Sequence, residues 1–135
     1  MLDRGSIAIF VLCILMLSGC KTMVSCDDGR DVVWFSSPAE HTVNNGIKDF
    51  EDGNFSAALP LFQSVVENKE ATKKLKIESY KYMAFIYCIT DREKQCRESF
   101  KKALETDPSF SLTLAEAGHP VWGPVFYNEK NKATK

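Results

Sequence analysis

YKYMAFIYCITDREKQCRESFKKALETDP, residues 80–108, is the stretch that decides the fold. Large and small apolar residues recur three or four positions apart on both sides of a polar turn near Arg92, which is the spacing of two amphipathic helices. The marked positions are Tyr80, Met83, Ala84, Tyr87, Cys96, Phe100, Ala103, Leu104 and Pro108. Small residues let antiparallel helices approach closely, and the large residues fill the space between them. The stretch predicts a helical hairpin that ends at Asp107-Pro108, because the residue before a proline disfavours the helical conformation.

A second, similar pattern lies upstream. It reads G-x3-F-x2-G-x-F-x2-A-x3-F and is formed by Gly46, Phe50, Gly53, Phe55, Ala58 and Phe62. Phe62 and Phe100 are equivalent, so the units lie 38 residues apart (100 minus 62), against about 34 in the tetratricopeptide repeat. Over about residues 42–110 the chain resembles a pair of such repeats, with four extra residues in the polar stretch 68–76. The predicted fold class is all-α, with two tetratricopeptide-like hairpins and an irregular aromatic lid at the C-terminal end, in a domain spanning residues 37–127.

Three local features refine the two hairpins. Residues 37–40, Ser-Pro-Ala-Glu, form a capping-box pattern that predicts the start of the first helix. Pro60 falls inside the second expected helix, where it would kink that helix or delay its start. Asp91 stands where the repeat has a turn glycine, and we expect it to N-cap a helix beginning at Arg92.

The C-terminal segment combines helix breakers with aromatic residues. Thr113 and Glu116 can cap a single helical turn. Two glycines and two prolines fall within residues 118–124, which predicts an irregular path through residue 127. Trp122 and Phe126 then either cover the repeat end as a lid or dock a partner, and residues 128–135 are predicted to be a disordered tail.

The N-terminal segment carries a lipidation signal. Residues 7–17 are apolar but too few to cross a bilayer, so they indicate a signal peptide. Residues 17–20, Leu-Ser-Gly-Cys, resemble the lipobox of bacterial lipoproteins. The resemblance implies that residues 1–19 are removed and that Cys20 is the lipid attachment site. Residues 21–36 show no apolar periodicity long enough for a helix or strand, so residues 20–36 are predicted to form a flexible tether.

Three cysteines then remain in an oxidising compartment: Cys26, Cys88 and Cys96. Cys88 and Cys96 are placed symmetrically about the turn at Arg92, and we predict a disulfide between them that leaves Cys26 free or available to a partner. The alternative is that Cys96 only fills a small-residue site and that Cys88 is a buried thiol.

The composition and motifs favour a binding role over an enzymatic one. The formal net charge of −1 argues against a nucleic-acid partner. Neither His41 nor His119 lies in a metal-binding or catalytic motif, so no enzyme activity, cofactor or metal is predicted. In repeat domains the first helix of each unit lines the concave face, which predicts the partner contacts there. The candidates on these helices are Asn45, Lys48, Asp49, Glu78, Lys81 and Tyr82.

A lipobox, the repeat ending LETDPSF and the closing GHPVWGPVF together resemble the small accessory lipoproteins of bacterial type VI secretion, the TssQ-like family. The resemblance implies an adaptor on the periplasmic face of the outer membrane, with a lipid bilayer and envelope or secretion proteins as partners. Lys21, following Cys20, is consistent with the outer-membrane sorting rule of enteric-type lipoproteins. The alternative is an adaptor of another envelope machine, such as a pilus pilotin or an outer-membrane assembly factor.

Overall fold

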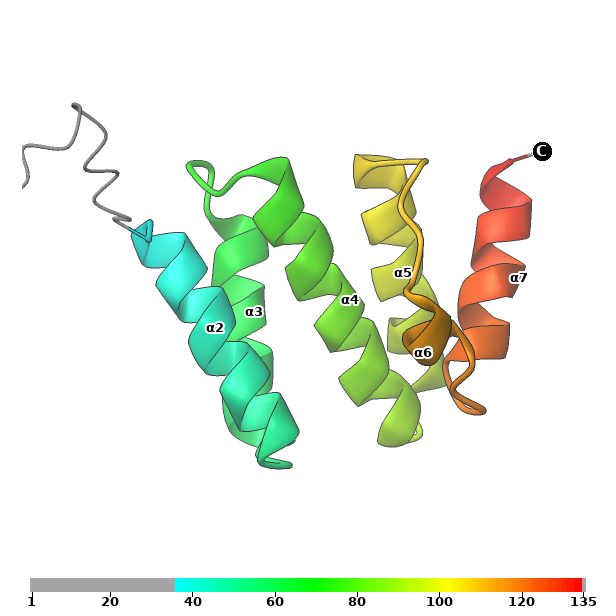
Figure 1. Cartoon of the computed structure of the whole chain (residues 1–135), viewed down its shortest axis with the longest axis horizontal. Coiled ribbons are helices and arrows are strands. Elements are labelled where there is room, and N and C mark those ends of the chain that lie inside the picture. The colour runs from blue at the N-terminus through cyan, green and yellow to red at the C-terminus, as the bar shows by residue number, and fades with distance from the viewer. Residues whose placement is uncertain (1–35, 135) are drawn as a thin grey trace, which may run out of the picture. The chain divides into compact units, whose positions relative to one another are not determined.

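The computed structural model describes residues 36–134. The predictions for the signal peptide, Cys20, Cys26 and the tether up to residue 35 lie outside these residues. The described part is all-helical, as predicted (Figure 1). Its helices are α2 (Pro38–Glu51), α3 (Phe55–Glu67), α4 (Lys73–Ile89), α5 (Glu93–Thr106), α6 (Leu114–Ala117) and α7 (Gly123–Ala133).

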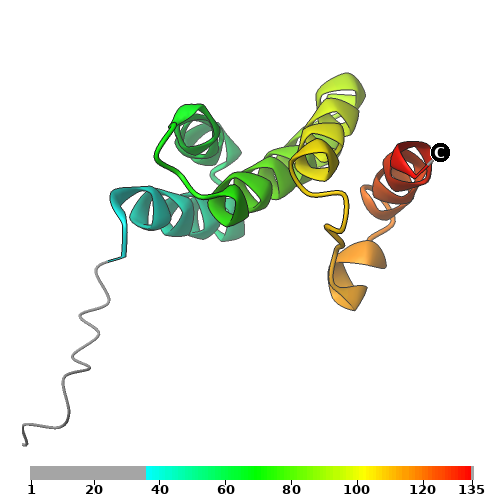
Figure 2. The same cartoon turned by 90° about the horizontal axis from the view of Figure 1, so that it is seen from above.

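The helices pack as antiparallel pairs, α2 with α3 and α4 with α5. α4 also contacts α2 and α3, and α7 packs against α5. Seen from above, the beginning of α4 lies between α2 and α6 on one side of the molecule, whereas α3 lies on the other (Figure 2). This arrangement agrees with the predicted tetratricopeptide-like hairpins.

The side chains between the helices form two buried clusters. The first consists of Ala39, Val43, Ala58, Phe62, Val65, Ala71, Met83 and Ile86. The second consists of Ala84, Phe85, Cys88, Cys96, Phe100, Leu104, Leu112 and Phe126. Phe62 and Phe100, which the sequence makes equivalent, are both fully buried. Gly46 lies directly against the ring of Phe62, as the predicted small-to-large register requires.

The local features at the helix ends agree only in part with the sequence. The Ser37 hydroxyl accepts a hydrogen bond from the backbone of Glu40, so the first helix is capped as predicted. α3 begins well before Pro60 and continues through it, so the helix is not delayed.

The prediction that Asp91 caps α5 is wrong, because Arg92 is the N-cap residue. Asp91 instead has φ +57°, the left-handed conformation that a turn glycine would supply. This lets the Arg92 N–H donate to the Tyr87 carbonyl oxygen at 2.8 Å and closes the turn. Aspartate tolerates the left-handed region better than most residues.

The C-terminal segment is more helical than predicted. Thr113 and Glu116 form the expected capping box on the single turn α6. The predictions of an irregular path through residue 127 and of a disordered tail from residue 128 are wrong for residues 123–133, which form α7. Pro124 lies in the first turn of α7, where its missing N–H breaks no intrahelical hydrogen bond. Buried Phe126 and Glu129 then fix one face of the helix toward α5.

Candidate protein-interaction face

Two hollows flank the first half of α4. The hollow between α2 and α4 has a volume of about 390 Å³ and is lined by Ser37, Glu40, Val43, Asn44, Thr72, Lys74, Leu75 and Glu78. The hollow on the other side of α4 has a volume of about 680 Å³ and is lined by Lys73, Lys74, Ile77, Glu78, Lys81, Thr106, Asp107, Pro108 and Phe110. Lys74 and Glu78 line both, so the hollows meet across α4. We call this combined surface the interaction face.

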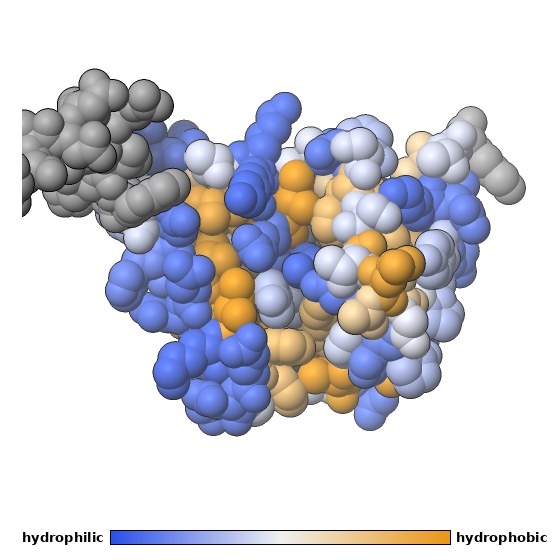
Figure 3. All heavy atoms as spheres, in the orientation of Figure 1, coloured by the Kyte–Doolittle hydropathy of each residue, from blue (hydrophilic) through white to orange (hydrophobic). Residues whose placement is uncertain are grey.

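The interaction face has an apolar floor and a charged rim. Val43 and Leu75 contribute apolar side chains to the first hollow, and Ile77 and Phe110 contribute them to the second. Figure 3 shows an apolar strip between α2 and α4 that is bordered by hydrophilic side chains. An apolar floor with a polar rim is the usual composition of a protein-binding surface.

An ion pair closes the lower border of the second hollow. Lys81 Nζ of α4 lies 2.7 Å from Glu116 Oε1 of α6, and the two side chains are only 14% and 22% exposed. Burial opposes ionisation of Glu116, but hydrogen bonds from Lys81 and from Thr113 outweigh it, so the pKa of Glu116 lies below its ordinary value. The contact links two segments 35 residues apart and holds α6 beside α4.

Tyr82 supports the face from below. Its ring stacks on Phe62 with centroids 5.3 Å apart and meets Phe50 and Phe85 edge-on at 5.2 and 5.8 Å. The Lys81 ammonium lies 4.7 Å from the Tyr82 ring centroid. Burial raises the pKa of Tyr82, and nearby carboxylates raise it further. Tyr82 therefore stays a neutral phenol whose ring mainly packs against the neighbouring aromatic side chains.

The structure brings together only some of the predicted partner-binding residues. Glu78 and Lys81 line the interaction face, and Tyr82 lies beside them. Of the α2 candidates, Asn45 hydrogen-bonds with the ring of His41, Lys48 pairs with Asp52, and Asp49 is partly exposed. None of these three residues lines either hollow.

Sequence reasoning missed the α2 side of the face, which is formed by Glu40, Val43 and Asn44. The signal was present in the helical spacing: Ala39, Val43 and Gly46 share the buried stripe of α2, so residues beside that stripe turn toward α4. The sequence-based prediction places these contacts about one turn later in the helix than the structure does.

The two aromatic candidates of the C-terminal segment pack against the domain. Trp122 stacks on Phe85 at 4.2 Å and on His119 at 3.4 Å between ring centroids, and its Nε1–H donates to the Glu116 carbonyl oxygen at 2.7 Å. Phe126 is 1% exposed, with its ring 5.3 Å from that of Phe100. These positions favour the lid over the docking segment.

The predicted pair Cys88 and Cys96 is joined by a disulfide, with Cα atoms 5.1 Å apart. Both residues are buried in the second cluster, so the bond ties the end of α4 to the first turn of α5. Within residues 36–134 no three potential metal-binding side chains gather at one place. No helix in this same range has the length and apolar character needed to cross a membrane.

Comparison with known proteins gives a distant match to part of the chain. No protein-family model matches the chain, and no solved structure matches it. Over 83 residues the chain is 28% identical to the photosystem I assembly protein Ycf3 of Synechococcus sp. (strain CC9605). The matched stretch covers 60% of this chain and 47% of that protein, so the chain spans about half the length of this relative. The paired helices of the described residues agree with the predicted tetratricopeptide-like hairpins.

Proposed function

We propose that this protein is an adaptor that binds a protein partner through the interaction face and is anchored to the outer membrane by lipid on Cys20. The observation that carries the binding role is the pair of hollows meeting across α4, with their apolar floor and charged rim. Repeat domains commonly use such a surface for binding, because helix packing does not consume it.

The finer proposal is an accessory role in type VI secretion, on the periplasmic side of the outer membrane. It rests on the lipobox at residues 17–20, on Lys21 directly after Cys20, and on the resemblance of the repeat and the closing segment to the TssQ-like lipoproteins. The second candidate is an adaptor of a pilus or of outer-membrane assembly, which the same anchor and helical repeats would equally serve.

A charge swap on the interaction face tests the binding role. Lys74→Glu with Glu78→Lys reverses an i, i+4 pair that borders both hollows, without changing net charge. The matched control is Glu98→Lys with Lys102→Glu, an i, i+4 pair on α5 that lines a hollow formed by α3, α4 and α5. Tagged full-length protein is recovered from detergent-solubilised envelopes, and the co-purified proteins are identified by mass spectrometry.

We expect the swap in α4 to lower the affinity for the partner about tenfold, a change of about 1.4 kcal/mol in the free energy of binding. The control variant should bind the partner as the wild type does. Equal recovery with both variants, each shown to be folded, would place the interface elsewhere. The identity of the partner separates the secretion role from the pilus and assembly roles.

A second experiment tests the anchor. Cys20→Ala should leave an uncleaved or unacylated chain, measured by intact mass and by flotation with the membrane fraction. A variant that matures to the wild-type mass and still floats would refute the lipid attachment site.

A further inference from the structure

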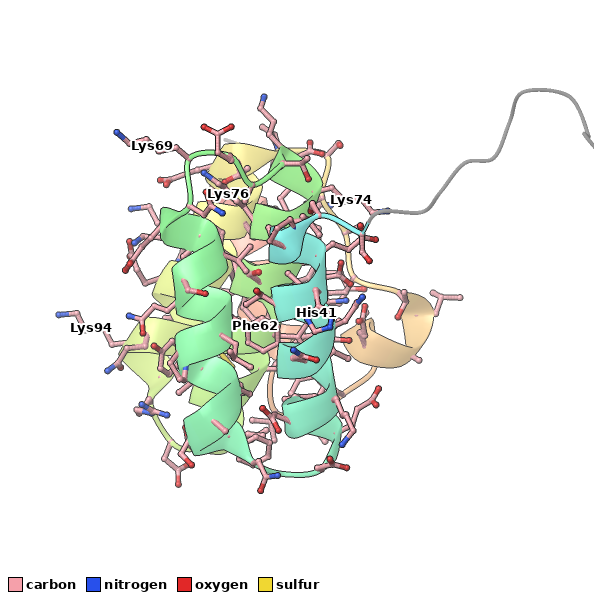
Figure 4. The ribbon with its side chains drawn as sticks, turned by 90° about the vertical axis from the view of Figure 1, so that its left-hand side faces the viewer. His41, Phe62, Lys69, Lys74, Lys76 and Lys94 are labelled. Atoms are coloured by element: carbon pink, nitrogen blue, oxygen red, sulfur yellow. A yellow bond between two sulfur atoms is a disulfide. The ribbon has the colours of Figure 1, made fainter. Side chains whose placement is uncertain are left out.

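One end of the domain is rich in lysine. Lys69, Lys73, Lys74 and Lys76 fall within eight residues of the connection from α3 to α4. None of the four takes part in an ion pair within residues 36–134. Figure 4 shows Lys69, Lys74 and Lys76 gathered at this end of the molecule. We call it the lysine-rich end.

The electrostatics of this end are unfavourable for the isolated fold. Three of the lysines lie in the first turn of α4, where the helix carries partial positive charge and acidic residues are normally preferred. No acidic residue lies in that turn. The carboxylates of Glu67 and Glu70 leave residues 67–76 with a formal charge of +2, four lysines against two glutamates.

The surroundings moderate this charge without cancelling it. Asp107 lies close enough to Lys73 for the lysine to help hold the pKa of Asp107 low, although hydrogen bonds from Ser109 are the main cause. At the other end of α2, residues 48–54 sum to −2, one lysine against three acidic residues. The segment that leads into α4 and the segment that ends α2 therefore carry charges of opposite sign.

The chain that precedes α2 leaves the domain beside the lysine-rich end. Ser37 lines the same hollow as Thr72 and Lys74. Ser36 lies sixteen positions after Cys20 (36 minus 20), and a chain of that length reaches at most about 55 Å. An anchor at Cys20 would therefore be joined to the domain at its lysine-rich end.

From these two observations we infer that the lysine-rich end docks on anionic lipid headgroups, an inference that rests on the proposed lipid anchor. Each lysine near an anionic surface raises the docked population about fivefold, over a range of about 8 Å at physiological salt. The interaction face shares Lys73 and Lys74 with this end, so a partner bound there would lie next to the membrane surface.

Lysine footprinting on vesicles tests the docking. Full-length mature protein is reconstituted into vesicles of phosphatidylcholine alone, or with about 30% phosphatidylglycerol to supply negative charge. A water-soluble amine-reactive acetylating reagent labels the lysines, and mass spectrometry gives a rate for each. The internal control is Lys94, which is exposed near the start of α5 and away from the lysine-rich end (Figure 4).

We expect labelling of Lys69, Lys74 and Lys76 to slow about threefold or more on the anionic vesicles and to recover in about 0.5 M salt, because salt screens the attraction. Lys94 should label at one rate in every condition. Equal rates on both vesicle types would overturn the docking, as would protection that is the same on neutral vesicles or persists in high salt.

Intact mass separates failure of this inference from failure of the proposed function. Acylated protein that shows no lipid-dependent protection refutes only the docking. Protein that matures without acylation refutes the anchor and the docking with it.

Discussion

Replacing Gly46 by alanine should destabilise the domain, although alanine is the better helix former. A Cβ atom at position 46 would lie 2.8 and 2.9 Å from Cε1 and Cζ of Phe62, whereas carbon atoms pack best at about 3.5–4.0 Å. Phe62 has no room to withdraw, because its ring is fully buried and stacks on Tyr82. α2 and α3 must then separate, or the ring must leave its preferred position.

The magnitude follows from two opposing terms. Overpacking a well-filled core costs about 1–3 kcal/mol. The upper half of that range applies here, because the new methyl group meets the Phe62 ring, whose other face packs on Tyr82. The higher helix propensity of alanine than of glycine stabilises the folded state by about 1 kcal/mol and offsets part of this cost. The expected net loss in the free energy of unfolding is about 1–2 kcal/mol, a fall in Tm of about 4–16 °C for a domain of this size.

Urea unfolding followed by circular dichroism at 222 nm measures this loss. Asn44→Ala, at the exposed position two residues earlier in α2, is the control for helix propensity and should gain about 0.5 kcal/mol. Adding Phe62→Leu to Gly46→Ala should cost less than the sum of the single variants, because the smaller side chain relieves the clash. A Gly46→Ala protein as stable as wild type, or strictly additive variants, would refute the predicted steric conflict.

Three further outcomes are expected, each measured by urea or thermal unfolding. Ser79→Ala should stabilise the domain by about 1 kcal/mol, because the Ser79 hydroxyl is buried without a hydrogen-bond partner among residues 36–134; a loss of stability would reveal a missed partner. Replacing Cys88 and Cys96 together by alanine should lower the free energy of unfolding by about 2–3 kcal/mol, since the disulfide closes a short loop, and an unchanged midpoint would contradict this. The pKa values of Glu116 and Glu129 lie below their ordinary values despite burial, because basic side chains bind both carboxylates. Their stabilisation is therefore complete above the ordinary carboxylate pKa and is lost as the pH falls through the lowered pKa. A Glu116→Gln, Glu129→Gln double variant should accordingly lose less stability than wild type between about pH 5 and pH 2, and parallel losses would count against it.

The hairpins were predictable because their signals are local. The spacing of Gly46, Ala58 and Phe62, and of Ala84, Cys96 and Phe100, sets which side of each helix is buried, and this spacing belongs to the chain before it folds. The Cys88–Cys96 disulfide could be predicted for the same reason. The two cysteines are only eight positions apart across a single turn, which leaves few ways to arrange the two helices that carry them.

The C-terminal segment shows where local signals are insufficient. A proline such as Pro124 ends one helix or begins another, depending on whether the residues after it find a surface to bury against. Phe126 and Glu129 find that surface on α5, where Arg97 Nη1 lies 3.2 Å from Glu129 Oε1. The helix-breaking Pro124 is visible in the sequence, but the surface of α5 on which the following residues pack is not. The sequence therefore predicted an irregular path in place of α7.

What the sequence determined by itself is therefore the all-helical class and the repeated register, because both depend on residues close together in the chain. It predicted the Cys88–Cys96 disulfide, but left two separate thiols as the alternative. What only the tertiary structure decided is the interaction face: the ion pair of Lys81 with Glu116, the meeting of Val43 with Leu75, and the placement of Ser37 beside Lys74. Those contacts join segments far apart in sequence, and they exist only because α2, α4 and α6 pack in one particular arrangement.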